Sequence, residues 1–278
     1  MLSLFGTACA GTHATSEPPA TEEAAPAEAV LTIGNPDRLS NDALTVFITG
    51  TNRGIGLEFV KQLSERGYNI IATARKPAEA TELKALAEGN EQIVIEQLDV
   101  TDKQRISDLA NKYGNRPIDI LINNAGLTPR YASAFKTASG IDWDISRRSM
   151  EINAFAPVWL SQAFMGQVAA SDQKKIVVIS SKAGSFELSP KMPMMYSYRA
   201  SKAALNMYMY TLSFETAKRD VILTMLSPGT VNTTPGFKMP DGIEVNDSVA
   251  KMLTVIDGLT SEHNGKFLDY SDGRELAW

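Results

Sequence analysis

The feature that most constrains the fold is an alternation of short apolar runs with helix-like segments, which begins at Leu44. Several of the runs are continuous enough to be strands buried on both faces of a sheet. Between them, apolar residues recur at helical spacing, as at Ile55, Phe59 and Leu63. Such an alternation predicts parallel strands joined by right-handed crossovers. The expected strands are Thr45–Thr49, Ile70–Ala74, Ile93–Glu96, Ile118–Ile122, Ile176–Ser180, Val221–Leu226 and Lys266–Leu268.

The predicted fold class is therefore α/β, with a single doubly wound Rossmann domain over residues 44–278 and a mostly parallel sheet of about seven strands. Residues 1–43 are expected to be a disordered tail, because Ser16–Val30 is rich in Pro, Ala and Glu and has no aromatic residue. The expected location is the cytoplasm. The alternative is a truncated lipoprotein-type signal around Cys9.

Composition excludes several classes of function. The chain has one cysteine, so an internal disulfide and a cysteine-based metal site are excluded, and no metal is expected. The two histidines lie near the chain ends, which argues against a Ser-His-Asp hydrolase. The net charge of −5 gives no reason to expect nucleic-acid binding. No transmembrane segment is expected, because polar residues interrupt the longest uncharged stretch, Ile152–Ser171, whose apolar residues fit one face of a helix.

A glycine-rich turn follows the first expected strand, at Gly50-Thr-Asn-Arg-Gly-Ile-Gly56. Gly50 permits a tight turn, Gly54 lets the backbone approach a pyrophosphate, and Gly56 lets the next helix pack closely. The start of that helix offers backbone N–H groups to an anion. A turn of this kind between a strand and a helix indicates a dinucleotide site. The residues assigned to it here are Gly50, Asn52, Arg53, Gly54, Ile55 and Gly56.

The second expected strand ends in Ala74-Arg75, where NAD-specific sites usually carry an Asp or Glu for the ribose 2′-hydroxyl. The carboxylate is absent and a cation is present. Arg53 in the glycine turn supplies a second cation. Two guanidinium groups suit a 2′-phosphate, so the sequence predicts NADP(H) as the cofactor. The alternative is two solvated arginines at a strand end.

Tyr198 and Lys202 lie four positions apart and would share one face of a helix. A neighbouring ammonium stabilises a phenolate, so Lys202 is expected to lower the pKa of Tyr198 towards neutrality, where a tyrosine can donate or accept a proton. Tyr196 has Ala200 at the same offset and lacks this partner. On its own such a pair often only solvates a helix face.

Further motifs follow the later strands. They are Asn123-Asn-Ala-Gly126, Asn153, Ser180-Ser-Lys-Ala-Gly184 and Ser227-Pro-Gly-Thr-Val-Asn-Thr233. Their order and spacing from Leu44 to Trp278 resemble the short-chain dehydrogenase/reductase family. Two phrases, Thr51-Asn-Arg-Gly-Ile-Gly-Leu-Glu-Phe-Val60 and Gly265-Lys-Phe-Leu-Asp-Tyr270 with Trp278, look most like its C-factor and sniffer-type carbonyl reductase branch.

The resemblance implies roles for individual residues. Tyr198 would be the acid/base and Lys202 its partner, which also holds the nicotinamide ribose; Ser181 would bind the substrate carbonyl, and Asn153 would hold a water in the proton path. Asp99 would contact the adenine amine, Asn124 the ribose side and Thr233 the carboxamide. The remaining residues assigned to the cofactor are Arg75, Val100, Ala125, Gly126, Pro228, Gly229 and Val231.

One departure concerns the serine. Ser181 precedes Tyr198 by 17 positions, more than the family usually shows, and Ser185 stands at the usual offset. Ser181 is preferred because it directly follows the strand. The intervening loop carries Met192, Met194 and Met195, and Phe237 and Met239 follow the Pro-Gly motif. These side chains suit a broad, adaptable apolar pocket; the alternative is ordinary surface or interface packing.

The sequence therefore predicts an NADPH-dependent oxidoreductase that reduces a small or medium apolar aldehyde or ketone to an alcohol. The alternative is a C-factor-like signalling protein that binds the nucleotide without significant turnover. The expected partner is a small-molecule carbonyl substrate. A homo-oligomer is compatible with the sequence, which fixes neither the oligomeric state nor the substrate.

Overall fold

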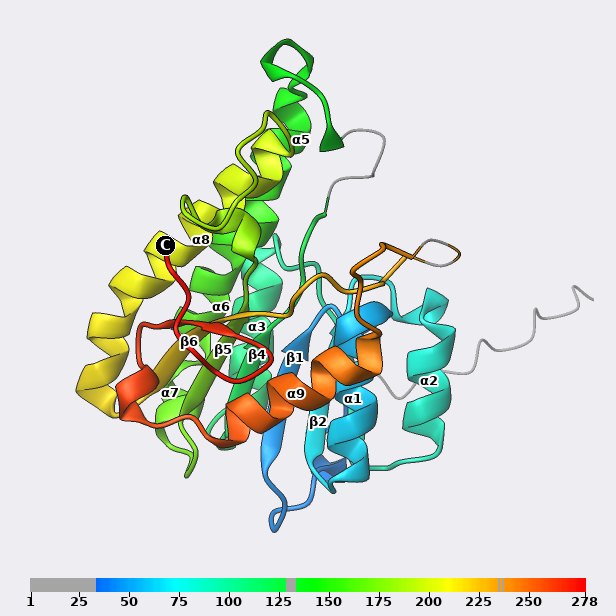
Figure 1. Cartoon of the computed structure of the whole chain (residues 1–278). Helices are drawn as coiled ribbons and strands as arrows, with labels where there is room; N and C mark the ends of the chain where they lie inside the picture. The colour runs from blue at the N-terminus through cyan, green and yellow to red at the C-terminus, as the bar shows by residue number, and fades with distance from the viewer. Residues whose placement is uncertain (1–33, 129–133, 235, 237) are drawn as a thin grey trace, which may run out of the picture. The chain divides into compact units, whose positions relative to one another are not determined.

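The computed structural model describes residues 34–278 except 129–133, 235 and 237. All seven strands are parallel and lie in the order β3-β2-β1-β4-β5-β6-β7. Figure 1 labels the central strands β2, β1, β4, β5 and β6. The chain reverses direction across the sheet between β3 and β4, which gives the doubly wound order of a Rossmann fold. The strands are β1 (Thr45–Thr49), β2 (Asn69–Ala74), β3 (Ile93–Gln97), β4 (Ile120–Asn123), β5 (Lys175–Ile179), β6 (Ile222–Ser227) and β7 (Phe267–Asp269). The predicted fold class is confirmed.

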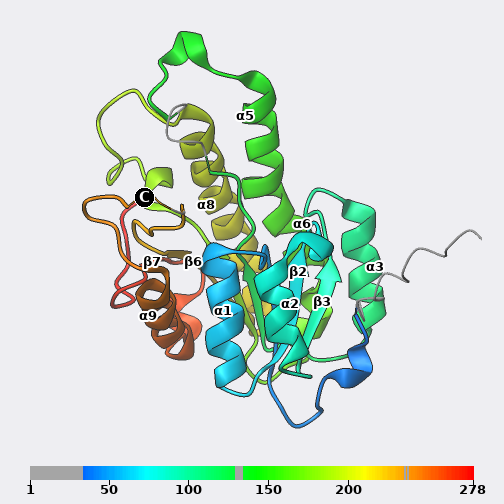
Figure 2. The same ribbon diagram turned by 90° about the vertical axis from the view of Figure 1, so that its right-hand side faces the viewer.

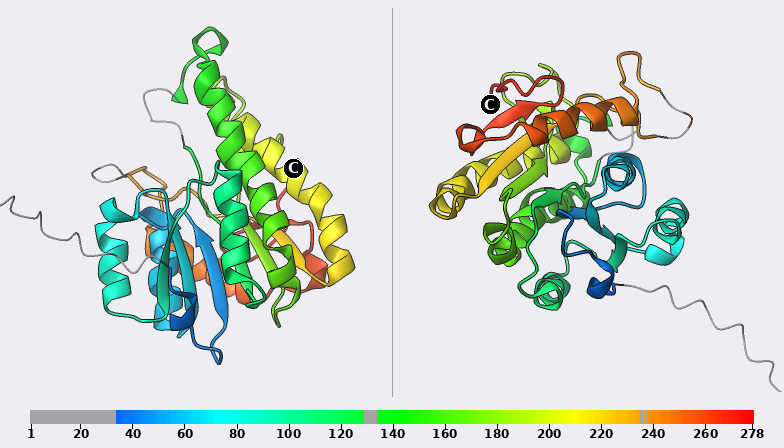
Figure 3. Two further views of the ribbon diagram at one scale, coloured as in Figure 1. Left: turned by 180° about the vertical axis from the view of Figure 1, so that it is seen from behind. Right: turned by 90° about the horizontal axis from the view of Figure 1, so that it is seen from below.

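Two helical layers cover the sheet (Figures 2 and 3). On β1, Phe47 faces one layer while Val46 and Ile48 face the other, as the alternation of side chains along a strand requires. One layer is α1 (Gly54–Glu65), α2 (Thr81–Glu88) and α9 (Val245–Asp257); the other is α3 (Lys103–Tyr113), α6 (Ala156–Ala163) and α8 (Tyr196–Thr216). Two further helices are α5 (Trp143–Met150) and α7 (Met165–Ala169).

The segment predicted as one helix from Ile152 is divided in the structure. A π-helical turn, Glu151–Phe155, joins α5 to α6, and α7 follows after a break at Phe164. The apolar periodicity is still satisfied, because Leu160, Phe164 and Val168 are buried in the same core. Among the described residues, no helix is both long and apolar enough to cross a membrane.

The expected boundary between residues 43 and 44 does not match the packing. Pro36–Arg38 forms a 3₁₀ turn, and Leu39 is 3% exposed within the core. The Asn69 side chain donates to the carbonyls of Ser40 and Ala43, at 2.7 and 3.0 Å. Residues 34–43 are therefore part of the domain and not of a tail. The rest of the expected tail, including Cys9, lies outside the described residues.

Candidate active site

The glycine turn between β1 and α1 is pressed against the loop after β4. A Cβ on Gly56 would stand 2.2 Å from the Gly50 carbonyl oxygen, so only glycine permits this close approach. The Asn124 side chain donates to the carbonyls of Thr49 and Gly50, at 2.9 and 3.1 Å. The Thr49 hydroxyl in turn accepts from the backbone N–H groups of Asn124 and Ala125. Asn124 thus fixes the shape of the turn from the neighbouring strand.

The outer side of this turn is open. Asn52 and Arg53 are exposed, and the nearest atom to a Cβ placed on Gly54 would be the Thr233 methyl group at 3.6 Å. Arg75, at the end of β2, is exposed as well. Neither the Arg53 nor the Arg75 guanidinium has an ion-pair or hydrogen-bond partner within the described part of the chain. Arg53 and Thr233 therefore lie at this open turn, and Arg75 is exposed at the end of the neighbouring strand β2.

The loop after β3 presents Asp99 to the same edge of the sheet. One carboxylate oxygen, Oδ1, accepts from the backbone N–H and the hydroxyl of Thr101, at 3.0 and 2.8 Å. The next residue, Val100, is buried in the core. Leu98 continues the hydrogen bonding towards Ala74 at the end of β2. Asp99 is thus held in a fixed orientation beside the end of β2.

Tyr198 lies in the first turns of α8, near the side chains of Ser181 and Thr128, whose hydrogen bonding acts on the pKa of its phenol. Ser181 directly follows β5, and Thr128 lies in the loop after β4. Three segments of the chain therefore converge on one phenol oxygen. Burial raises the pKa of Tyr198 above its ordinary value, and the two hydrogen bonds lower it by less than burial raises it.

Lys202 lies one turn further along α8 and is buried. Its ammonium donates to the Ile179 carbonyl at 2.8 Å and lies 5.9 Å from the centre of the Tyr198 ring. Burial lowers the pKa of Lys202 to about 8. The expected lowering of the Tyr198 pKa by Lys202 is not found in this structure: the ammonium bonds to a backbone carbonyl, and burial dominates the titration of the phenol.

Asn153 occupies the π-helical turn, a local widening that is frequent at functional sites. Its side chain accepts from the Leu127 N–H at 2.7 Å and donates to the Leu127 carbonyl at 3.0 Å. It also donates to the Ser201 hydroxyl at 3.0 Å. Asn153 thus joins α8 to the loop that carries Thr128, and Gly126 lies beside it.

The structure separates the two rival serines. Ser181 caps the start of the 3₁₀ turn η5 (Lys182–Gly184), and hydrogen bonding from its side chain acts to lower the pKa of Tyr198. Ser185 is 2% exposed, and its hydroxyl accepts from the N–H groups of Glu187 and Leu188. Its role in the structure is therefore to stabilise a turn. Thr128 was not predicted, because the motif that ends at Gly126 gives no signal for the second residue beyond it.

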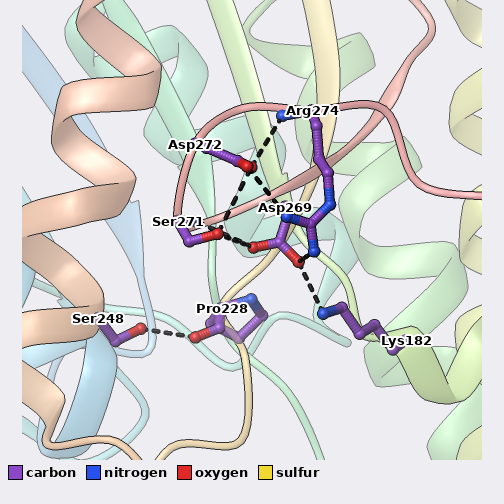
Figure 4. Close-up of polar contacts among 7 residues, drawn as sticks. All are labelled: Lys182, Pro228, Ser248, Asp269, Ser271, Asp272 and Arg274. Carbon is purple, nitrogen blue, oxygen red and sulfur yellow. Dashed lines mark hydrogen bonds and ion pairs between the residues drawn. The ribbon is translucent and has the colours of Figure 1, made fainter.

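The loop after β6 contributes the last group of predicted site residues. The buried Ser248 of α9 donates to the Pro228 carbonyl at 2.7 Å (Figure 4). Beyond Gly229, Val231 pairs with Ile243 in a short parallel bridge. This pairing brings Thr233 beside Gly54. Phe237, beyond this point, lies outside the described residues.

Comparisons with known proteins agree with this geometry. Residues 44–240 match the family model described as short chain dehydrogenase. C-signal of Myxococcus xanthus is 34% identical over 163 residues, which cover 58% of this chain and 93% of that protein. The carbonyl reductase Sniffer of D. melanogaster superposes with a TM-score of 0.78 at 27% identity, covering 85% of this chain and 100% of that one. An NADPH-bound carbonyl reductase from chicken fatty liver gives 0.77 at 33% identity, with 85% and 99% covered.

The family match spans most of the folded chain, and the parallel sheet and the positions of the site residues at strand ends agree with it. The chain is therefore an oxidoreductase of the short-chain dehydrogenase/reductase family, in the branch that contains C-signal and the sniffer carbonyl reductases.

Proposed function

We propose that this protein is an NADPH-dependent reductase of aldehydes or ketones, with Tyr198 as its acid. The observation that carries the proposal is the meeting of the Tyr198 and Ser181 side chains where β5 ends and α8 begins. Two neighbouring hydroxyls can both point at a single carbonyl oxygen. That arrangement suits the developing negative charge of a carbonyl under reduction.

The residues of the open turn fit NADP(H). The turn leaves space over Gly54, the start of α1 supplies backbone N–H groups, and Arg53 and Arg75 are free to meet a 2′-phosphate. Asp99 would face the adenine, and Thr233 the carboxamide. When bound, the nicotinamide supplies the hydride that the carbonyl carbon receives. Similar proteins include a carbonyl reductase bound to NADPH.

The chain's own residues then handle the oxygen and the proton. Ser181 would donate a hydrogen bond to the substrate oxygen and hold it against Tyr198. Tyr198 would donate its proton to that oxygen as charge develops there. Lys202, whose ammonium donates to the Ile179 carbonyl, would hold the nicotinamide ribose. Asn153 would hold the loop after β4 in place against helix α8. A water beside Asn153 would return a proton to Tyr198 after the reaction.

The loop before α8 suggests an apolar substrate. Met192 is 47% exposed, and Met194 and Met195 are partly exposed next to Tyr196 at the start of α8. Methionine side chains adapt to irregular apolar shapes. The substrate class proposed is therefore a small or medium apolar carbonyl compound.

The test is the oxidation of NADPH by the purified protein in the presence of a panel of aliphatic and aromatic aldehydes and ketones. We expect turnover of several members and, from each, the matching alcohol. Tight NADPH binding with no turnover of any member would overturn the enzyme proposal. That outcome would favour a nucleotide-binding signalling role, the second candidate, which the likeness to C-signal supports.

A further inference from the structure

The residue that follows Ser181 forms an ion pair with the end of the sheet's edge strand. Lys182 Nζ lies 2.7 Å from Asp269 Oδ2 (Figure 4). Asp269 is the last residue of β7 and is 1% exposed. A carboxylate this deeply buried needs a cation and hydrogen bonds to remain charged. The pair therefore joins two parts of the fold that are distant in sequence.

Asp269 is also the centre of the turn that follows β7. Its other oxygen, Oδ1, accepts from the N–H and the hydroxyl of Ser271, at 3.0 and 2.6 Å. Arg274 Nη2 lies 3.6 Å from Oδ2. Burial acts to raise the pKa of Asp269, but Lys182 and Ser271 outweigh it and hold the pKa below its ordinary value. Asp269 is thus a charged, fixed point on the edge strand.

The turn η5, which carries Ser181 at its start, is held from a second side by α8. A Cβ on Gly184 would stand 2.7 Å from the backbone of Lys202, so the turn and the helix touch directly. The Ser181 hydroxyl accepts from the Ala183 N–H at 3.1 Å, so its direction follows the turn. Any displacement of η5 therefore changes how Ser181 meets Tyr198.

A second link ties the same region to the C-terminal segment. Glu187, just after η5, donates its N–H to the Trp278 carbonyl at 3.1 Å. Leu276 in turn pairs with Phe267 of β7 at 2.7 Å. The end of the chain is thus anchored on β7 and borders the loop that follows Ser181. Of these links, the Lys182–Asp269 pair is the one that reaches η5 itself.

We propose that Asp269 and Lys182 are positioning residues for Ser181: the buried carboxylate of β7 holds η5 against α8 and so sets the distance between the Ser181 and Tyr198 hydroxyls. The inference rests on the proposed function. It assigns to the C-terminal edge of the sheet a part in the reaction, although none of its side chains touches the phenol. Small misplacements of reacting groups are costly in rate, so the effect should be on turnover.

The test compares Lys182→Met, Lys182→Arg and Asp269→Asn with a matched control, Lys266→Met. Lys266 pairs with Glu275 at 2.6 Å beside the same strand, and that pair is exposed and does not reach η5. In Lys182→Met and Asp269→Asn we expect kcat to fall by about tenfold, with the KM for NADPH within about twofold of wild type. Lys182→Arg should restore most of the turnover, and the control should keep all of it.

A double variant, Lys182→Met with Asp269→Asn, should be no slower than either single variant, because both act through one contact. Wild-type kcat in both single variants would overturn the proposal. An equal loss in Lys266→Met would do the same, as would a fall in kcat that only follows the unfolded fraction measured by circular dichroism.

A second measurement needs no activity. The ¹³Cζ resonance of Tyr198, assigned by its absence in Tyr198→Phe, reports the hydrogen bonding of the phenol. In Lys182→Met and Asp269→Asn it should move in the same direction as in Ser181→Ala, and it should stay in place in Lys266→Met. An unmoved resonance would overturn the positioning proposal. A wild-type protein that is inert towards every carbonyl would overturn the proposed function while leaving this measurement decisive.

Discussion

The two halves of the carboxyl edge of the sheet are built differently. On the side of β1 and β2, the charged groups expected to meet a cofactor, Arg53 and Arg75, are exposed and have no partners within the described residues. On the side of β4, β5 and α8, the polar groups are already bonded to one another. Asn153 bonds to Leu127 and Ser201, and Lys202 bonds to Ile179.

The difference separates affinity from chemistry. The open half, on the side of β1 and β2, can lose the Arg53 or Arg75 side chain without disturbing the fold, because no residue that the structure describes bonds to either guanidinium. The side of β4, β5 and α8, here called the bonded half, is preorganised. No energy is therefore needed to orient its polar groups during the reaction. Substitutions in the open half should change which nucleotide binds. Substitutions in the bonded half should change turnover, stability or both.

The largest expected effect is that of Tyr198→Phe. The change keeps the ring and removes the proton donor, so kcat should fall by at least about a hundredfold, while the Kd for NADPH stays nearly unchanged. Steady-state kinetics and a binding titration measure the two quantities. Tyr196→Phe is the control, because Tyr196 is exposed and lacks the Lys202 partner. A variant that kept more than about a tenth of the wild-type rate, a barrier change of less than about 1.4 kcal/mol, would exclude Tyr198 as the acid.

Burying the Lys202 ammonium in the bonded half should lower the free energy of unfolding. Because burial lowers the pKa of Lys202 to about 8, the unfolded chain binds more protons than the folded one between about pH 8 and 10.5. The positive charge of Lys202 therefore lowers the free energy of unfolding below about pH 8. This loss disappears as the pH rises from about 8 to 10.5 and the folded protein no longer has to bury a charged ammonium. The unfolding free energy of the apoprotein, measured relative to Lys202→Met, should rise by roughly 3 kcal/mol between pH 7.5 and 10.5.

Urea unfolding of both proteins at several pH values measures this difference, since the other titrating groups are common to both. Lys175→Met is a control for the effect on turnover. Burial also lowers the pKa of Lys175, but this lysine lies at the start of β5, at the end opposite the site. A wild-type curve parallel to that of Lys202→Met at every pH would show that Lys202 carries no such penalty. Turnover should be lost in Lys202→Met and retained in Lys175→Met if the latter folds.

In the open half, Arg75→Ala should reduce the preference for NADPH over NADH. A charge-assisted hydrogen bond contributes roughly 1.5–3 kcal/mol, so the loss should be on the order of 10- to 100-fold in kcat/KM for NADPH alone. Ala74→Asp should act in the same direction, since a carboxylate repels the phosphate and accepts from a 2′-hydroxyl. Arg219→Ala, an exposed arginine beyond the end of α8, is the control. Equal kcat/KM for both cofactors in the wild type would mean that Arg53 and Arg75 are only solvated.

The sheet could be predicted from the sequence because its strands are continuous apolar runs, a local signal. The Thr45–Thr49 strand is matched residue for residue, and the one expected at Ile176–Ser180 is displaced by one residue, to Lys175–Ile179. The topology also explains why the candidate site could be predicted from the sequence. Motif residues that end parallel strands must gather at one edge of the sheet, so Ser181, Asn124 and Thr233 could be grouped without coordinates.

What could not be predicted depends on contacts between distant segments. Leu39 follows a polar, proline-rich stretch, and only its insertion into the core shows that it belongs to the domain. The π-helical turn at Asn153 keeps the apolar periodicity of an ordinary helix, so the pattern cannot reveal it. The meeting of Lys182 with Asp269 requires the edge strand to be placed first. The pKa of Tyr198 depends on burial, which no spacing encodes.

The smallest expected effect tests whether Thr128 belongs to the bonded half. Hydrogen bonding from its side chain acts to lower the pKa of the Tyr198 phenol. Thr128→Val keeps the shape and removes the bond, so the phenol becomes a weaker acid. A neutral hydrogen bond contributes about 1 kcal/mol, so kcat should fall by roughly fivefold, and the alkaline limb of the pH–rate profile should move to higher pH. Thr128→Ser keeps the hydroxyl and should retain both the rate and the profile. The Thr128 hydroxyl would have no part in proton transfer if the valine variant were as fast as wild type, or if the serine variant were as slow as the valine one. Thr128 would then not belong to the bonded half.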